Sequence, residues 1–220
     1  MPTEPLAYNP PADPYLDIVF QDTDIIVLNK PAGLLSVPGR AAEHKDCLQS
    51  RVQEKYPGAL TIHRLDMDTS GLVVMALNAK TQKDIGRLFE TRQVEKEYTA
   101  LVSGIVAANE GEIDLPLICD WPNRPLQKVD HENGKAATTR WQVIERNPNA
   151  HMTRLRLIPL TGRSHQLRVH MKETGHAILG DRFYGDAAND GERLMLHARR
   201  LSFTLPGRDE PYDFTVNSPF

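Results

Sequence analysis

Short apolar runs alternate with turn-forming residues along this chain, a pattern typical of a protein made mostly of strands. The runs Leu16–Phe20 and Ile25–Asn29 predict two strands joined by the polar turn Gln21–Asp24. Lys30-Pro31-Ala32-Gly33 then ends the second strand, because Pro and Gly interrupt a ladder. Leu72–Leu77 is apolar throughout and predicts a strand that is buried on both faces.

The second half of the chain adds further strands, joined mainly by hairpin-like turns. They are expected at Tyr98–Val106, Thr138–Glu145, Met152–Ile158 and Leu194–Phe203. Asn147-Pro148-Asn149-Ala150 separates the middle two and is a strong turn signal. The region between the first and second of these strands has no clear periodicity, and we expect it to be rich in loops.

Helical spacing of apolar residues occurs in three segments. They are Leu48–Tyr56, Asn78–Arg92 and Ser164–Thr174. Pro57-Gly58 and Gly175 follow the first and the third as stop signals, and Asn78 is a cap for the second. Because strands outnumber helices and the turns are hairpin-like, we predict an α+β fold with a mixed, mostly antiparallel sheet flanked by helices and loops.

Length and composition narrow the class of protein. The 220 residues are 40% hydrophobic, which is enough for a substantial core. No stretch approaches the roughly 20 apolar residues of a membrane span, and Met1–Pro14 lacks the basic and apolar regions of a signal peptide. We therefore expect a soluble cytoplasmic protein without a membrane partner. Cys47 and Cys119 are far apart and predict neither a disulfide nor a zinc site.

The charge is distributed unevenly. The net charge is −3, which argues against a protein that coats nucleic acid through bulk electrostatics. The segment Arg154–Arg200, however, holds nine arginines and lysines against five acids, with histidines interleaved. That segment could form a phosphate-tracking face, although charge alone favours an ordinary solvated surface.

Two polar motifs interrupt the apolar pattern. In His63–Gly71, Asp66 stands close to Arg64 just before the apolar strand. In Thr161–His170, two arginines, two histidines and a glutamine gather within eight residues, more polar groups than a core accepts without partners. The start of the third helix also offers backbone N–H groups to an anion. The two motifs suggest a single charged cleft.

These motifs closely resemble the RluA family of RNA pseudouridine synthases. The matching stretches are His-Arg-Leu-Asp-x-x-Thr-Ser-Gly at 63–71, Gly-Arg-x-His-Gln-Leu-Arg-x-His at 162–170 and Gly-His-x-Ile-Leu-Gly-Asp at 175–181. Supporting matches lie at 29–34, 96–98, 134–136 and 194–198, so the resemblance covers nearly everything after residue 15. Ala136 and Ala177 stand where the family usually has proline.

The resemblance implies an isomerase that converts uridine to pseudouridine in structured RNA. The reaction needs no redox partner and no hydrolysis, so no cofactor and no metal is expected. The run Pro116–Pro125 resembles the dual-specificity member of the family, which acts on both transfer RNA (tRNA, at the anticodon stem-loop) and 23S ribosomal RNA (rRNA). A synthase that acts on a single rRNA substrate is the alternative.

The resemblance also assigns roles to residues. Asp66 is the catalytic carboxylate, which adds to ribose C1′ or uracil C6 or acts on the C2′ proton; the sequence leaves these three routes open. Arg168 pairs with that carboxylate and keeps it ionised. Tyr98 stacks on the target base, Arg64 helps to extrude or replace the flipped nucleotide, and Leu196 packs at the pocket wall.

Further RNA contacts are expected from polar side chains of both motifs and of the third helix. They are His63, Arg163, His165, Gln166, His170 and Lys172. Arg163, Gln166 and His170 share one side of the predicted helix, so that side should face a partner. His165 and His170 could instead be metal ligands, but no third Cys, His or acidic ligand has a recognisable spacing, so RNA contacts are expected.

The domain prediction is a Pro-rich extension at 1–15 and a catalytic domain at 16–220, with two sheet-bearing lobes around a central RNA-binding cleft. The chain has no room for a separate N-terminal RNA-binding domain, and no pattern implies a protein partner, so a monomer is expected. Two other functions are alternatives. A nucleoside or glycoside hydrolase would use Asp66 and Asp68 as a carboxylate pair, and an RNA-binding module would bind RNA without turnover.

Overall fold

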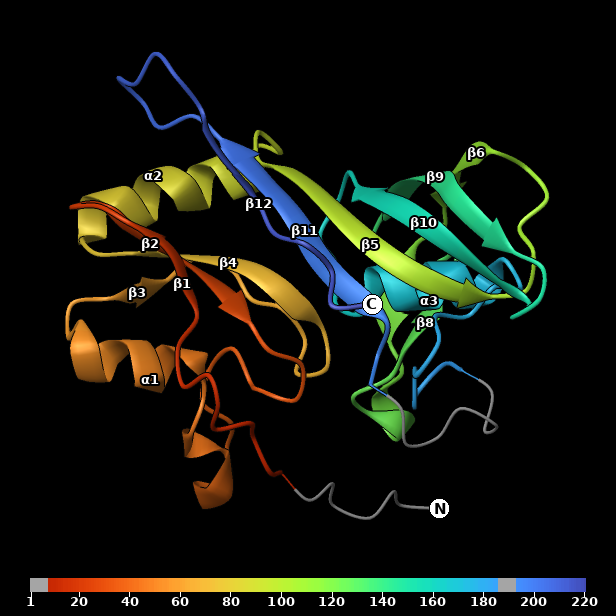
Figure 1. Cartoon of the computed structure of the whole chain (residues 1–220), viewed down its shortest axis with the longest axis horizontal. Coiled ribbons are helices and arrows are strands. Elements are labelled where there is room, and N and C mark those ends of the chain that lie inside the picture. Colours follow the sequence, from red (N-terminus) through yellow and green to blue (C-terminus); the bar gives the residue numbers. More distant parts are fainter. Residues whose placement is uncertain (1–7, 186–192) are drawn as a thin grey trace. The chain divides into compact units, whose positions relative to one another are not determined.

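The computed structural model describes residues 8–185 and 193–220. The chain divides into two units, the first formed by residues 1–90 and 205–207 and the second by residues 91–204 and 208–220 (Figure 1). Each unit carries its own layer of strands.

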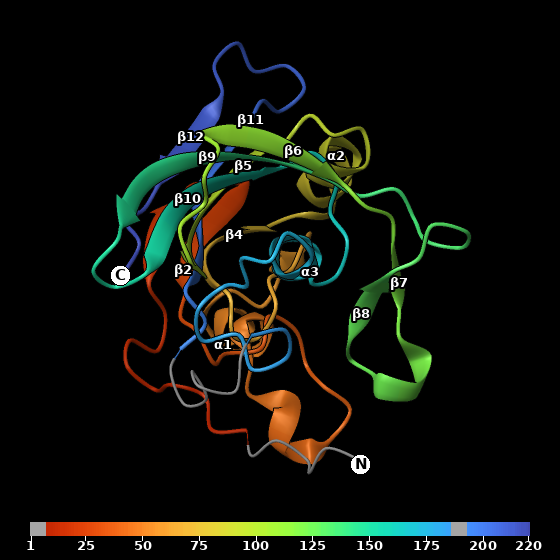
Figure 2. The same ribbon diagram turned by 90° about the vertical axis from the view of Figure 1, so that its right-hand side faces the viewer.

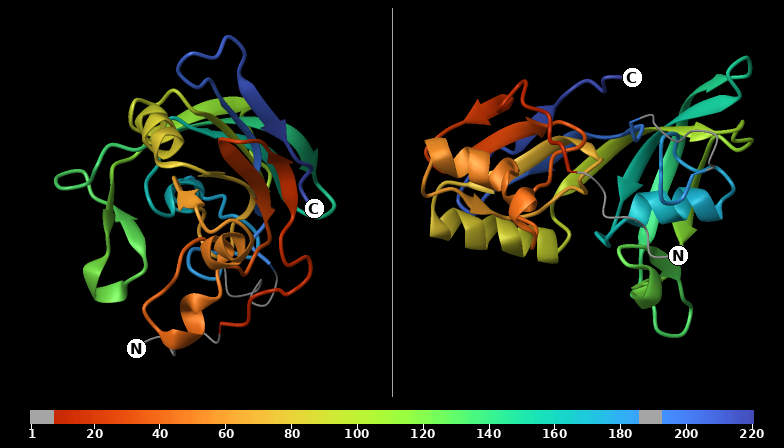
Figure 3. Two further views of the ribbon diagram at one scale, coloured as in Figure 1. Left: turned by 90° about the vertical axis from the view of Figure 1, so that its left-hand side faces the viewer. Right: turned by 90° about the horizontal axis from the view of Figure 1, so that it is seen from below.

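Unit 1 contains a small antiparallel sheet in the order β1-β2-β4, with β3 paired to β4 (Figure 3). Its strands are β1 (Ile18–Gln21), β2 (Ile25–Lys30), β3 (Leu60–Thr61) and β4 (Ser70–Ala76). Its helices are the short 3-10 helix η1 (Ala42–Lys45), α1 (Leu48–Lys55) and α2 (Ala79–Glu90). Every residue of β4 is buried, as its continuous apolar sequence predicts.

Unit 2 contains an antiparallel sheet in the order β11-β5-β10-β9-β6, with β12 paired to β11. Its strands are β5 (Glu95–Ser103), β6 (Glu110–Asp114), β9 (Thr138–Asn147), β10 (Met152–Pro159), β11 (Leu196–Phe203) and β12 (Tyr212–Thr215). The helix α3 (Gln166–Glu173) accompanies this sheet.

A separate hairpin stands to one side of the sheet of unit 2 (Figure 2). It consists of β7 (Leu117–Cys119) and β8 (Gln127–Val129), with the short 3-10 helix η2 (Trp121–Asn123) at its tip. Trp121 is 65% exposed there, and the guanidinium of Arg124 lies 4.4 Å from its ring centre.

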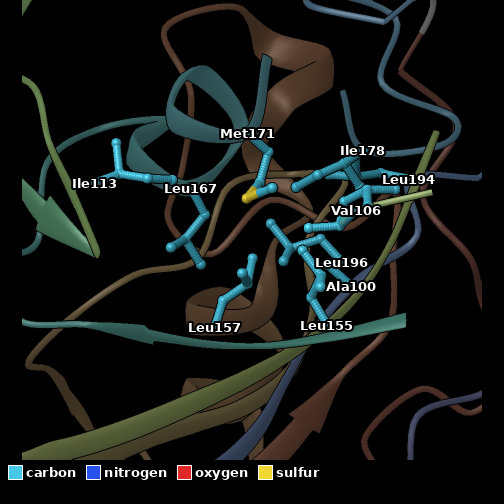
Figure 4. Close-up of a cluster of buried hydrophobic side chains, with 11 residues drawn as sticks. Ala100, Val106, Ile113, Leu155, Leu157, Leu167, Met171, Ile178, Leu194 and Leu196 are labelled. Carbon is cyan, nitrogen blue, oxygen red and sulfur yellow. The ribbon is translucent and has the colours of Figure 1, made fainter. Parts of the chain in front are cut away.

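The core of unit 2 lies between the sheet and α3. Leu167 and Met171 of α3 point toward Leu155 and Leu157 of β10 and toward Ala100 of β5 (Figure 4). Because side chains alternate across a strand, the residues between these apolar positions face the opposite side of the sheet. The sheet therefore has an apolar face under α3 and a polar outer face.

The predicted fold class is confirmed, since the structure is α+β with a mostly antiparallel sheet and few helices. The predicted cap of α2 is also present, because Asn78 Oδ1 accepts the N–H of Thr81 at 2.9 Å. The strand expected at Tyr98–Val106 instead spans Glu95–Ser103, and Gly104 follows it with φ +77°.

The region between residues 107 and 137 is rich in loops, as expected, but it also contains three short strands that were not predicted, β6, β7 and β8. These strands are short, and β6 has a single apolar residue, Ile113, so their sequence carries almost no strand period. The strand β12 was not predicted either. No helix in the described ranges 8–185 and 193–220 is long and apolar enough to cross a membrane.

Candidate active site

A buried lysine holds the loop that carries Asp66. Lys30, at the end of β2, is fully buried, and its ammonium group donates to three backbone oxygens. These are the oxygens of Leu34 at 2.7 Å, Pro31 at 2.8 Å and Met67 at 2.9 Å. A buried ammonium is tolerated only when hydrogen bonds compensate it, and here all three donors have acceptors. Lys30 therefore ties the Asp66 loop to the turn after β2.

A serine fixes the other side of the same loop. Ser36 Oγ donates to the oxygen of Leu65 at 2.7 Å and accepts the N–H of Leu65 at 3.1 Å. The N–H of Thr69 donates to the oxygen of Asp66 at 3.2 Å, which closes a turn. Leu65 is buried, Asp66 is partly exposed and Arg64 is exposed. The loop thus presents a carboxylate and a guanidinium from an anchored backbone, as a reactive group requires.

His63 is part of the support of this loop. Its Nε2 accepts the N–H of Val74 at 3.0 Å, and its ring stacks on Phe89 with centroids 4.6 Å apart. An Nε2 that accepts a hydrogen bond carries no proton, so the ring is neutral with its proton on Nδ1. This contact gives His63 a positioning role between β4 and α2.

In unit 2, Arg168 forms a buried bidentate ion pair with Asp181. Arg168 Nε lies 2.7 Å from Asp181 Oδ2, and Arg168 Nη2 lies 2.6 Å from Asp181 Oδ1. Asp181 Oδ1 also accepts the N–H groups of Phe183 at 3.0 Å and Tyr184 at 3.2 Å. Both side chains are almost completely buried. The geometry fixes the plane of the guanidinium.

Aromatic rings surround this ion pair. The Arg168 guanidinium lies 5.1 Å from the ring centre of Phe183 and 5.3 Å from that of Tyr184. His165 stacks on Phe183 with centroids 5.8 Å apart. The Tyr184 hydroxyl lies 2.7 Å from His165 Nδ1 and accepts the N–H of Gln127 at 2.8 Å. Tyr184 therefore connects the β7–β8 hairpin to Arg168.

Gln166 and His170 lie inside unit 2, contrary to the expectation that they face a partner. Gln166 Oε1 accepts from Thr161 at 2.8 Å and from the N–H of Arg163 at 3.0 Å. Its Nε2 donates to the oxygen of Thr138 at 3.0 Å and to Thr139 Oγ1 at 3.0 Å. Of the backbone N–H groups expected to be open to an anion at the helix start, that of Arg163 is thus already bonded.

The His170 ring is fully buried as well. Its Nδ1 lies 2.9 Å from Thr139 Oγ1, and its Nε2 lies 3.1 Å from the oxygen of Leu115. Burial lowers the pKa of its imidazole, so the ring is neutral at physiological pH. Like Gln166, His170 fixes α3 against β9 and the turn after β6.

The other expected site residues occupy different environments. Arg163 is exposed and donates from Nε to the oxygen of Ala136 at 3.1 Å. Lys172 is exposed and pairs with Glu173 at 2.7 Å. Tyr98 is partly buried against the core cluster, and Leu196 is a 3% exposed member of that cluster. Leu196 therefore packs as a core side chain of β11 (Figure 4).

Several residues of the site were missed in the sequence. Asp181 stands in the third matched motif, but 13 residues separate it from Arg168, and no spacing rule links a helix to a later turn. Phe183 and Tyr184 follow it directly. Lys30 was interpreted only as a strand terminator, and Ser36 carried no signal. Within the described part of the chain, no group of three or more His, Cys, Asp or Glu side chains could hold a metal ion.

The comparisons with known proteins all match this chain to the same family. Residues 24–173 match the family model described as RNA pseudouridylate synthase. A protein named dual-specificity RNA pseudouridine synthase RluA from Vibrio parahaemolyticus is 55% identical over 91% of this chain and 82% of its own length. The protein of the same name from Escherichia coli strain K12 is 50% identical over 97% of this chain and 98% of its own.

A solved structure resembles the fold as well. Human RNA pseudouridylate synthase domain containing 1 matches with a TM-score of 0.78 at 29% sequence identity. The match covers 99% of this chain and 87% of the human chain. Its extent includes both the segment that holds Asp66 and the segment that holds Arg168.

Proposed function

From the premise that the chain belongs to the RNA pseudouridylate synthase family, we propose that it isomerises uridines in both tRNA and 23S rRNA, with Asp66 as its essential residue. One observation supports the proposal of dual specificity. The relatives that align over most of this chain, at 50% and 55% identity, have names that say dual-specificity. A synthase restricted to one rRNA uridine is the alternative.

The chemistry is a redox-neutral rearrangement. The N1–C1′ bond breaks, the uracil turns without leaving, and a C5–C1′ bond forms. The proton lost from C5 is balanced by the proton that N1 gains, so the reaction needs no external oxidant or water. A carboxylate on an anchored loop suits each of the three routes proposed for Asp66, namely attack at C1′, attack at C6 and transfer of the C2′ proton.

Arg168 is the proposed cation for the Asp66 carboxylate, a role that comes from the family resemblance. The fixed plane of its guanidinium supports this role. Because Asp181 and two aromatic rings already hold the Arg168 side chain, it loses little conformational entropy when it binds a second carboxylate. Tyr98 is proposed to stack on the target base, and Leu196 to support the pocket wall. Asp181 is the positioning residue of this set.

RNA binding is proposed to fall on the exposed cations of the site. Arg64 is assigned to the flipped-out nucleotide, and Arg163 and Lys172 to the phosphate backbone. His165, which is partly exposed and stacked on Phe183, is a further candidate. His63, Gln166 and His170 are reassigned to positioning, since their ring and amide atoms serve backbone and side-chain groups of the protein.

The cellular setting follows from the substrates. We place the protein in the cytoplasm, where both RNAs are made, with residues 16–220 as the catalytic domain and residues 1–15 as an extension. A monomer without a protein partner is sufficient for a reaction that needs only the enzyme and its RNA.

The test is pseudouridine mapping, by chemical derivatisation, of tRNA and 23S rRNA from cells that lack this protein. Complementation with the wild-type chain should restore pseudouridine in both RNAs, and complementation with Asp66→Ala should restore none. Loss from one RNA only would establish the single-substrate alternative. No loss from either RNA would contradict the proposed substrates and favour a module that binds RNA without turnover.

A further inference from the structure

The outer face of the sheet of unit 2 contains a polar groove of about 470 Å³. Its floor is β5, which contributes Glu97 and Thr99, and its walls include Arg154 and Arg156 of β10 and Arg199 of β11. The strand order β11-β5-β10 places these arginines on both sides of β5 (Figure 1). Tyr98, Ile144, Asn217 and Ser218 complete the lining.

This groove lies on the opposite side of the sheet from α3 and Arg168. Leu155 and Leu157 of β10 pack with the helix, and strand alternation turns Arg154 and Arg156 away from it. The β5 register agrees, because Arg156 lies opposite Thr99, and Leu155 lies opposite Ala100 of the core cluster. An irregularity in the β5–β11 register between Ala198 and Arg200 gives Arg199 its position at the wall.

The residues that line the groove carry a net positive charge. Three arginines line it against a single acid, Glu97. Glu97 lies 3.4 Å from Arg156 and is shared with Arg200 at 3.6 Å. Arg154 donates to the oxygen of Phe220 at 2.8 Å and lies 3.9 Å from Glu145, which is outside the lining. In the described residues, the guanidinium of Arg199 makes no hydrogen bond or ion pair, in contrast to that of Arg200, which pairs with Asp213.

The arginines also remain accessible. The side chain of Arg156 is 39% exposed and that of Arg154 is 26% exposed. Planar guanidinium groups bind phosphate oxygens through two parallel hydrogen bonds, which an ammonium group cannot do. Arginines on both sides of a narrow floor can therefore clamp one phosphate-linked strand. The one aromatic residue of the lining, Tyr98, packs against the core cluster.

We infer that this groove binds the phosphate backbone of the substrate RNA at a segment outside the loop that carries the target uridine. The inference rests on the proposed function, because RNA is the polyanion on which the enzyme acts. The groove adds affinity without reading sequence, which suits a protein whose proposed substrates are two RNAs of different sequence context. It also gives a role to the basic segment Arg154–Arg200 beyond that of a solvated surface.

The test compares two RNAs and two matched variants. Full-length tRNA carries backbone on both sides of the anticodon stem-loop, whereas the isolated stem-loop does not. The double variant Arg156→Ala/Arg199→Ala removes two groove charges. The control is Arg140→Ala paired with Lys80→Ala, which removes two charges outside the groove. Arg140 lies on β9 and is ion-paired to Glu112 at 2.9 Å, and Lys80 lies on α2 and is ion-paired to Asp84 at 2.8 Å. Fluorescence anisotropy measures Kd for each RNA as a function of salt.

The groove variant should bind full-length tRNA about tenfold more weakly. The slope of the logarithm of its association constant against the logarithm of the salt concentration should be shallower by about 2, because each lost phosphate contact reduces that slope by about 0.9. Its affinity for the stem-loop and its single-turnover rate on the stem-loop should stay at the wild-type values. Arg156→Lys/Arg199→Lys should recover most of the salt slope, because it restores the charge. An unfolding midpoint that matches the wild type shows that the loss is not structural.

Three results would overturn the inference. These are an unchanged salt slope on tRNA, an equal loss on tRNA and stem-loop, and an equal loss in the control variant. An acidic peptide that binds the wild-type protein but not the groove variant, while tRNA binds both equally, would also overturn it, in favour of a protein ligand. The proposed function can fail independently, because Asp66→Ala should show the same groove-dependent binding without turnover.

Discussion

Arg168 and Asp181 form a bidentate ion pair inside unit 2, with both N–O distances at or below 2.7 Å and both side chains almost completely buried. Asp181 also holds the N–H groups of Phe183 and Tyr184, the residues whose rings flank the guanidinium. The carboxylate of Asp181 therefore helps to orient both the guanidinium of Arg168 and the two rings beside it. If Arg168 pairs with Asp66 as proposed, Asp181 affects the reaction rate by orienting Arg168, without contacting the substrate.

Asp181→Asn should destabilise the protein and slow the reaction. Removing one charge of a buried pair leaves the other charge uncompensated, which costs about 3 kcal/mol of unfolding free energy. Urea unfolding measures that loss. Single-turnover kinetics should show a lower rate at saturating RNA with little change in Kd, because the RNA-facing cations are untouched.

The matched control removes both charges. Arg168→Met/Asp181→Asn should recover a large part of the lost stability, since no buried charge remains, but it should not recover the rate. If the double variant were as active as the wild type, the role of Arg168 in catalysis would be disproved. If Asp181→Asn unfolded at the wild-type urea concentration, the ion pair would not stabilise the fold.

Tyr184→Phe should loosen the β7–β8 hairpin. The change keeps the ring near Arg168 but removes the hydroxyl that accepts the Gln127 N–H and bonds His165. The loss of such a bond is worth about 1 kcal/mol. Amide hydrogen exchange at Gln127 should therefore be several-fold faster, with no comparable change in β10. Trp121→Ala, at the exposed tip, is the control and should leave the exchange of Gln127 unchanged.

Lys30→Met should disturb the Asp66 loop. It removes the donor that three carbonyl groups share, of which, among the described residues, only that of Met67 keeps another donor, the N–H of Gly33. The expected cost is about 3 kcal/mol. Urea unfolding and the turnover rate should both fall. Lys80→Met is the control, because Lys80 only pairs with Asp84 on the exposed side of α2. Equal effects of the two variants would show that the three carbonyl contacts do not matter.

Stability should fall as the pH is lowered from 7 toward 5. Burial, reinforced by the positive charge of Arg193, lowers the pKa of His197 to about 4 from 6.5. Between these values the unfolded chain binds a proton that the folded chain does not, so acid favours unfolding. The contribution is fully present above pH 6.5 and is lost as the pH falls toward 4. Its full size is about 3 kcal/mol.

Urea unfolding at pH 7, 6 and 5 measures this dependence before most carboxylates titrate. Burial lowers the pKa of His170 too, so that residue acts in the same direction. His197→Gln should flatten the pH dependence without abolishing it. A wild-type stability that rises between pH 7 and pH 5 would contradict the assignment of a depressed pKa to these two histidines.

The sequence predicted those parts of the fold in which a local pattern is strong. The apolar run of β4, the Asn78 cap of α2 and the turn at Asn147–Ala150 each depend on neighbouring residues alone. The hairpin β7–β8 was missed because its strands have three residues each and are held by long-range contacts, including that of Gln127 with Tyr184.

The sequence predicted which residue types form the candidate site, but not the residues that position them. Helical spacing placed Arg163, Gln166 and His170 on one side of α3, and that side was expected to face a partner. All residues from Gln166 to Met171 are buried, so the helix has no exposed middle, and periodicity cannot separate its polar side from its core side. The partner of Arg168 was missed because it depends on a turn that follows the helix.

The most direct test of the account is a single-turnover assay of Asp66→Ala on purified tRNA, with Kd measured on the same RNA and Asp68→Ala as the control. The account predicts no detectable pseudouridine with Asp66→Ala at a Kd within a few-fold of the wild type, and nearly normal turnover with Asp68→Ala. Normal turnover with Asp66→Ala, or a loss confined to RNA binding, would contradict the assignment of Asp66 as the catalytic residue.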